Sequence, residues 1–191
     1  MGNFYTNITV HGPTQDKVAD ALSEMDRTAY VSPTVGGYTI VYDAECDDQD
    51  TEIIGRLTAD LSRQLECAAI ALLNHDDDVL WYQLYKNGEL VDEYNSAPDY
   101  FEPEAEPSGP AGGDAAKLMQ AFGGAADTKE LEKVLRISSL DDDGYTFEYE
   151  RHQALARLLG MPPFGVGRGF NYIHDGELPE GLTEADLRRV G

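Results

Sequence analysis

The run of this sequence with the most reactive side chains is Asn74-His75-Asp76-Asp77-Asp78, which follows a short apolar stretch. Carboxylates beside an imidazole can hold a divalent cation or polarise a general base, so His75, Asp76 and Asp78 are the candidate metal-binding or catalytic residues. Three successive aspartates, however, lack the alternation of a calcium-binding loop, and aspartates in turns commonly accept hydrogen bonds from the local backbone. A polar turn between two strands is the competing interpretation, and we predict no catalytic residue, bound metal or cofactor.

A second acidic stretch contributes five carboxylates in an approximately alternating pattern. They are Asp43, Glu45, Asp47, Asp48 and Asp50. No glycine follows where a calcium-binding loop turns sharply, so the pattern favours the N-terminal side of a helix, where the helix dipole stabilises negative charge. Asp43 is kept as a further member of the His75 cluster, should that cluster belong to an enzyme.

The charge of the chain limits its partners. The sequence has 36 acidic and 14 basic residues, a net charge of −22, and residues 1–102 hold 20 acidic against five basic residues. Such a surface repels phosphate groups, so nucleic acid and anionic membranes are disfavoured as partners, whereas a basic protein is attracted. The acidity can instead serve solubility or adaptation to salt, because net charge acts directly on solubility.

The first hundred residues carry alternating strand and helix patterns. Side chains in residues 4–10 alternate with a period of two, and apolar residues in 18–25 and 53–65 recur at helical spacing. Asn87-Gly88 between two hydrophobic runs is the strongest short-range signal for a hairpin. We therefore predict an α+β fold, with a ferredoxin-like β-α-β-β-α-β sheet, an added hairpin and a helical C-terminal part.

Three segments follow from this pattern. Residues 1–96 are predicted to form the sheet domain, residues 97–113 a Pro- and Gly-rich linker, and residues 114–191 a mainly helical segment packed on the sheet. Within the last segment, FNYIHDGE is typical of a short strand and turn. Thr183 with Asp186 three residues later resembles a capping box, which predicts a short terminal helix.

The predicted hairpin carries large side chains on both of its faces. Alternation places the odd-numbered residues from Trp81 to Tyr85 on one face and the even-numbered residues from Leu80 to Leu84 on the other. Either the C-terminal helices cover the second face, or an aromatic patch rimmed by acids is left exposed as a partner site. The candidate partner-binding residues are Trp81, Tyr85, Glu93, Tyr94, Asp99 and Tyr100.

Three segments resemble a group of uncharacterised bacterial proteins that share a domain of unknown function. They are LWYQLYKNGELVDEYNSAPDYF, RHQALARLLGMP and GFNYIHDGELP. The resemblance implies a bacterial, cytoplasmic origin and brings no activity or site residue. The cysteine content agrees with a reducing compartment, because Cys46 and Cys67 alone do not make a disulfide framework, and neither a secretory signal nor a bilayer-spanning run is visible.

Two classes of function remain open. The concentrated acidity and the lack of a catalytic motif favour a non-enzymatic interaction protein that engages a basic protein partner, as immunity proteins that neutralise basic toxins do. The alternative is a metal-assisted hydrolase or small-ligand enzyme that uses the cluster of His75, Asp76 and Asp78.

Overall fold

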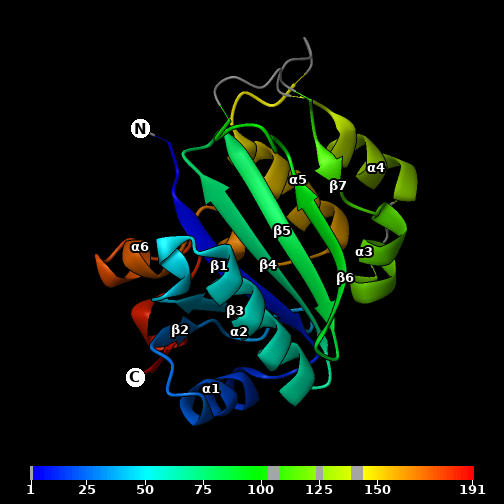
Figure 1. Cartoon of the computed structure of the whole chain (residues 1–191). Helices are drawn as coiled ribbons and strands as arrows, with labels where there is room; N and C mark the ends of the chain where they lie inside the picture. The colour runs from blue at the N-terminus through cyan, green and yellow to red at the C-terminus, as the bar shows by residue number, and fades with distance from the viewer. Residues whose placement is uncertain (1, 103–107, 124–126, 139–143) are drawn as a thin grey trace.

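A computed structural model of the chain describes residues 2–102, 108–123, 127–138 and 144–191. The described residues form an antiparallel sheet of eight strands in the order β7-β6-β5-β4-β1-β3-β2-β8 (Figure 1). The strands are β1 (Tyr5–His11), β2 (Ala29–Val31), β3 (Tyr38–Asp43), β4 (Ala68–His75), β5 (Val79–Lys86), β6 (Glu89–Asn95), β7 (Ala111–Gly112) and β8 (Arg188–Val190). With the helices that cover it, this sheet confirms the predicted α+β class.

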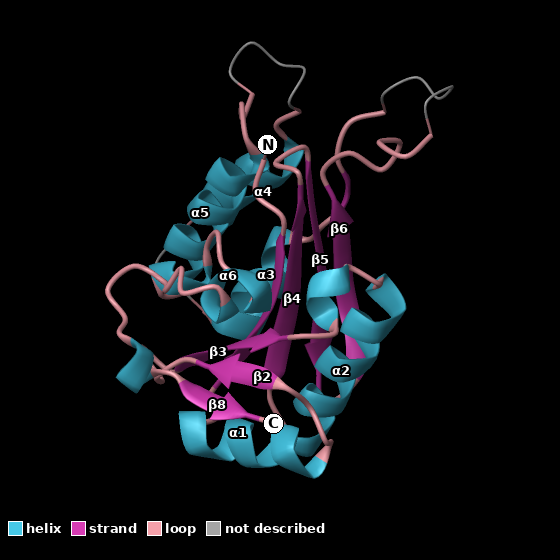
Figure 2. Cartoon of the chain, turned by 90° about the vertical axis from the view of Figure 1, so that its left-hand side faces the viewer, coloured by secondary structure: helices cyan, strands magenta, loops and turns pink. Residues whose placement is uncertain are grey.

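Helices cover both faces of the sheet (Figure 2). One face carries α1 (Gln15–Glu24) and α2 (Thr51–Gln64), and the other carries α3 (Ala115–Phe122), α4 (Thr128–Arg136), α5 (Glu148–Leu159) and the short α6 (Phe170–His174). Because successive strand residues point to opposite faces, Ala71 of β4 packs towards α1 and α2 while Leu72 packs towards α3 and α5. Coverage on both faces explains why residues 68–73 of β4 are all apolar.

The cap of α2 and a glycine in its second turn set this helix against the sheet. The Asp50 side chain accepts hydrogen bonds from two backbone amides of the first turn, which would otherwise lack partners. A Cβ atom on Gly55 would lie 2.7 Å from the Gln83 Oε1 atom and 2.9 Å from the Tyr85 hydroxyl. The helical cost of this glycine, about 1 kcal/mol, is therefore offset by the close approach of α2 to β5.

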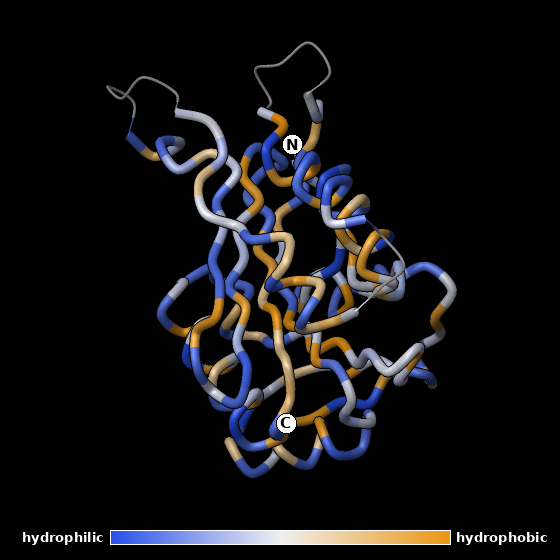
Figure 3. Tube along the Cα trace, turned by 90° about the vertical axis from the view of Figure 1, so that its right-hand side faces the viewer, coloured by the Kyte–Doolittle hydropathy of each residue, from blue (hydrophilic) through white to orange (hydrophobic). Residues whose placement is uncertain are grey.

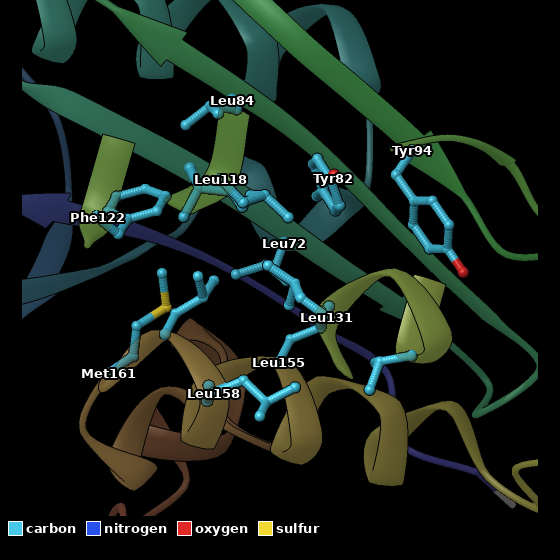
Figure 4. Close-up of a cluster of buried hydrophobic side chains, with 14 of the residues drawn as sticks. Leu72, Tyr82, Leu84, Tyr94, Leu118, Phe122, Leu131, Leu155, Leu158 and Met161 are labelled. Atoms are coloured by element: carbon cyan, nitrogen blue, oxygen red, sulfur yellow. The ribbon is translucent and has the colours of Figure 1, made fainter. Parts of the chain in front are cut away.

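The larger hydrophobic core lies between the sheet and the C-terminal helices (Figure 4). Strands β4, β5 and β6 contribute Leu72, Tyr82 and Tyr94, and helices α3, α4 and α5 contribute Leu118, Leu131 and Leu155. The C-terminal helices thus cover the face of the hairpin that carries Leu80, Tyr82 and Leu84. Figure 3 shows that hydrophobic and hydrophilic stretches alternate along the chain. None of the described helices is long and apolar enough to cross a membrane.

The hairpin between β5 and β6 forms as the sequence predicts. Lys86 pairs with Glu89 across a two-residue turn, and Asn87 and Gly88 both have positive φ angles, 52° and 84°. A type I′ turn requires positive φ at both central residues, and asparagine and glycine adopt it most readily. This local signal alone fixes the register of the hairpin at its tip.

The C-terminal region corrects two expectations and enlarges the sheet. The capping box of Thr183 and Asp186 forms, but it opens a single 3₁₀ turn (Glu184–Asp186) instead of a terminal helix. The chain then continues as β8, which pairs with β2 through Ala29 and Val190. The predicted strand in FNYIHDGE is α6, which packs against the sheet through Phe170. Pairing with the open edge of β2 overrides the local helix signal, and β7 and β8 make the sheet wider than predicted.

Candidate functional site

A pocket of about 390 Å³ is lined by residues from the end of β4 and the start of β5. This end of the sheet lies close to the N-terminus (Figure 1). Strand β4 contributes His75 and strand β5 contributes Trp81, both on the face that carries α2. Other parts of the chain also line it, among them Phe4 before β1, Asp48 and Gln49 before α2, Asn95 of β6 and Phe101 after β6. We call this site the aromatic pocket.

Aromatic rings surround His75 in this pocket. The ring centroid of His75 lies 5.1 Å from Phe4, 5.8 Å from Tyr100 and 5.1 Å from Phe101. The three neighbouring rings are 43%, 41% and 68% exposed, and they make up half of the six large hydrophobic side chains that are exposed in the described chain. Exposed aromatic side chains that gather in one place mark an interaction site more often than a structural feature.

A hydrogen-bond chain selects one tautomer of neutral His75. The amide nitrogen of Gln49 donates to the carbonyl oxygen of Asn74 at 2.8 Å, so the Gln49 Oε1 atom is the one that faces His75. This oxygen lies 2.7 Å from the His75 Nδ1 atom and can only accept, which places the proton on Nδ1. In the neutral imidazole, Nε2 is then left as a hydrogen-bond acceptor.

The three aspartates after His75 point to different partners. Asp76 accepts from the Gly2 amide at 3.0 Å, Asp77 accepts from Asn3, and Asp78 accepts from the Tyr100 hydroxyl at 2.9 Å. Asp76 and Asp77 have positive φ angles, 55° and 63°, which aspartate tolerates in turns. Within the described residues, no group of three or more His, Cys, Asp or Glu side chains is arranged to hold a metal ion.

The carboxylates of the second acidic stretch also lie in different environments and do not form one cluster. Asp43 is buried and pairs with Arg27, whose guanidinium also reaches Glu45 at 2.7 Å. Asp43 therefore does not join His75. Asp50 caps α2, as its place before a helix predicts, while Asp48 is exposed and lines the aromatic pocket.

Asp47 is buried and joins the N-terminal strand to the C-terminal region. Its carboxylate accepts hydrogen bonds from the Thr6 amide at 3.1 Å and the Asn171 amide at 2.7 Å. Burial raises the pKa of Asp47 from 3.8 to about 6, although both amides act to lower it. A Cβ atom on Gly169 would lie 2.3 Å from the Asp47 Oδ1 atom, so glycine is required where the chain approaches this carboxylate.

The raised pKa of Asp47 predicts a pH dependence of stability. Between pH 4 and pH 6 the folded state binds more protons at this residue than the unfolded state, so its contribution to stability is present at low pH and falls as the pH rises. Relative to an Asp47→Asn variant, the wild-type free energy of unfolding should fall by about 1–2 kcal/mol over this range. Urea denaturation of both proteins at several pH values measures the difference; a constant difference would contradict the raised pKa.

The structure distributes the predicted partner-binding residues over different environments. Trp81 lines the aromatic pocket. The ring of Tyr100 lies against the ring of His75, which also lines this pocket. Asp99 accepts a hydrogen bond from the Ser108 amide at 2.8 Å and so stabilises the turn after β6. Tyr85 lies under α2, 9% exposed.

The remaining two candidates lie on opposite faces of β6. Glu93 is exposed and lines a second concavity of about 260 Å³ that shares Trp81 and Asn95 with the aromatic pocket. Tyr94 is 1% exposed, stacks on Tyr82 in the C-terminal core, and donates a hydrogen bond to the Leu135 carbonyl oxygen. A partner could contact the Tyr94 ring only if the C-terminal helices moved away.

Sequence reasoning missed Phe4, Asp48, Gln49 and Phe101 as members of one site. They come from three segments that no periodic pattern connects. The one available signal was the adjacent pair Tyr100-Phe101 in a polar segment, because two exposed aromatics in a turn have no packing function of their own.

A larger cavity of about 440 Å³ lies on the opposite face, beside α5. Its wall includes Arg157, Arg168 and Glu180, so it combines both signs of charge. Arg168 already donates to the Gly167 carbonyl oxygen at 2.7 Å. This cavity contains none of the candidate metal-binding, catalytic or partner-binding residues that the sequence predicts.

Comparisons of the chain with protein-family models, with curated proteins and with solved structures find no significant match.

Proposed function

We propose that this chain is a non-enzymatic interaction protein that binds a basic protein partner at the aromatic pocket, in the manner of immunity proteins that neutralise basic toxins. The observation that carries the proposal is the exposed ring of Phe4, Tyr100 and Phe101 around His75, on a chain with a net charge of −22. Apolar surface supplies affinity, and the surrounding acids select a cationic partner.

The charges around the pocket support a basic partner. Asp48 lines the pocket, and Asp76 and Asp78 lie exposed in the turn that follows His75. Carboxylates gathered around one concave site attract cations and raise the rate of encounter. Salt screens such attraction over about 10 Å at 0.1 M ionic strength, so binding should weaken as salt is added.

A fourth exposed aromatic lies next to the same turn. Phe147 is 53% exposed, and the amide of the following residue, Glu148, donates to the Asp77 carbonyl oxygen at 2.8 Å. Four exposed aromatics from three segments of the chain therefore meet at one end of the sheet. A surface of this kind suits a protein partner better than a small molecule, because it extends beyond the pocket itself.

The metal-assisted alternative has less support from the geometry. It requires His75, Asp76 and Asp78 to converge, whereas each of them bonds a different segment and only His75 lines the pocket. A cation held by these residues would have to break the hydrogen bonds of both aspartates.

We also propose that β1 to β4 with α1 and α2 form a ferredoxin-like unit. The support is the strand order β4-β1-β3-β2, antiparallel pairing throughout, and both helices on one face. Many unrelated functions occur on this arrangement, so it adds nothing to the choice of partner.

Replacing Phe101 with alanine is expected to weaken binding of the basic partner by about 5- to 30-fold, because an exposed aromatic anchor contributes about 1–2 kcal/mol. The test immobilises the protein, captures partners from the native lysate at low salt, and then measures the affinity of the captured protein. Leu90→Ala is the matched control: Leu90 is 49% exposed and lies beside the hairpin tip. Recovery of no basic protein, or equal binding by both variants, would contradict the proposal.

A further inference from the structure

We propose that the aromatic pocket receives the side chain of an arginine from an extended segment of the basic partner. This inference rests on the proposed function and names the group that the pocket recognises. It follows from the aromatic residues and the hydrogen-bond acceptors among the residues that line the pocket, and from the second concavity beside it.

The walls suit a flat cation. Trp81, Phe4 and Phe101 line the pocket with aromatic rings, and tryptophan is the strongest partner for a cation among the aromatic side chains. A guanidinium group is planar and weakly hydrated, so it stacks on such faces at a lower desolvation cost than an ammonium group. The pocket volume of about 390 Å³ leaves room for the arginine and for the backbone on either side of it.

Two acceptors can receive the N–H groups of the guanidinium. The His75 Nε2 atom is an acceptor because Nδ1 carries the proton towards Gln49. Asp48 lines the same pocket, and its exposed side chain offers a charged acceptor. Arginine presents five donors in a fixed plane and can use both acceptors at once, which a single ammonium group does less well.

The neighbouring concavity extends the site along the sheet. Trp81 and Asn95 line both hollows, so the hollows adjoin. The second hollow is also lined by Glu93, which is exposed, and by the short strand β7. A segment whose arginine occupies the aromatic pocket would therefore continue towards Glu93, where a second basic residue finds a carboxylate.

Fluorescence of Trp81, which is the single tryptophan of the chain, reports occupancy directly. The probes are the peptide acetyl-Gly-Arg-Gly-Arg-Gly-amide and its counterparts with lysine or with the neutral isostere citrulline in place of arginine. We expect a saturable change with the arginine peptide, at least 10-fold weaker binding of the lysine peptide, and no saturation with citrulline. Phe101→Ala should lower the affinity for the arginine peptide by about 5- to 30-fold. Val35 is exposed away from the pocket, so Val35→Ala should leave this affinity unchanged.

The outcomes separate this inference from the proposed function. If lysine and arginine peptides bind equally, or Phe101→Ala has no effect on the arginine peptide while the captured basic partner still depends on Phe101, the arginine assignment is overturned and the function stands. If neither the peptides nor any basic protein binds at low salt, both are overturned.

Discussion

Replacing Arg151 with alanine is expected to lower the free energy of unfolding by about 3–5 kcal/mol, because it leaves a buried carboxylate without its partner. Arg151 is fully buried in α5, and its guanidinium donates to Glu148, itself 3% exposed, at 2.6 Å. The same group donates to the carbonyl oxygens of Val134 and Ile137 at the end of α4, the latter at 2.6 Å. One side chain thus joins α4 to α5.

Aromatic contacts add to the role of Arg151. Its guanidinium carbon lies 4.8 Å from the centroid of the Tyr145 ring and 5.9 Å from that of Tyr94. Burial raises the pKa of Glu148, while the hydrogen bond and the charge of Arg151 act to lower it. Without Arg151, the Glu148 carboxylate would have to be protonated or exposed, and either change disrupts the core between α4, α5 and the sheet.

Chemical denaturation followed by circular dichroism measures this effect. Arg157→Ala is the matched control, because Arg157 lies on the same helix, is exposed, and should change stability by no more than about 0.5 kcal/mol. The loss of stability in Arg151→Lys should lie between those of Arg151→Ala and Arg157→Ala. An ammonium group keeps the charge but cannot reach all the acceptors that the planar guanidinium reaches. A loss below about 1 kcal/mol for Arg151→Ala would contradict this account of the C-terminal core.

Neutralising two acids, one that lines the aromatic pocket and one in the adjacent turn, is expected to weaken binding of the basic partner by roughly 100-fold at low salt. Each close charge pair across an interface contributes at least about 1.5 kcal/mol, so two pairs give about 3 kcal/mol. The variant is Asp48→Asn with Asp78→Asn. Asparagine has the shape of aspartate and can still accept the hydrogen bond that Tyr100 donates to residue 78 at 2.9 Å, so the fold is preserved.

The control removes the same charge from the opposite end of the sheet. Glu66 and Glu89 are exposed, and they lie where β4 begins and where β6 leaves the hairpin turn. Glu66→Gln with Glu89→Gln should change affinity by no more than a few-fold. Isothermal titration calorimetry at two salt concentrations compares both variants with the wild type. An equal loss of affinity in the two double variants would show that the partner responds to the net charge of the chain and not to the aromatic pocket.

Much of the fold of residues 1–96 could be predicted because its signals are local. The alternation in β1, the helical spacing in α2 and the Asn87-Gly88 turn each act within one element. The C-terminal region behaves differently. Residues 188–190 are a strand only because β2 offers an unpaired edge, and no local pattern reports the presence of that edge.

The candidate site could be predicted only in pieces. His75, Trp81 and Tyr100 were each singled out, for separate reasons, and the structure brings all three to one end of the sheet. Phe4 and Phe101 lie 97 positions apart in the sequence and meet only through the folded sheet. Tyr94 is predicted from the sequence to contact a partner but is buried in the C-terminal core. Which face of β6 remains exposed depends on where α3 to α5 pack, and no local pattern reports this.

The most direct test of the proposed function is hydrogen exchange of the chain with and without the captured basic protein. Our account predicts slower exchange at the segments that build the aromatic pocket, residues 48–51, 73–81 and 95–101, with residues 184–190 unchanged. Protection confined to the region of β8, or to the cavity beside α5, with no change around His75, would contradict it.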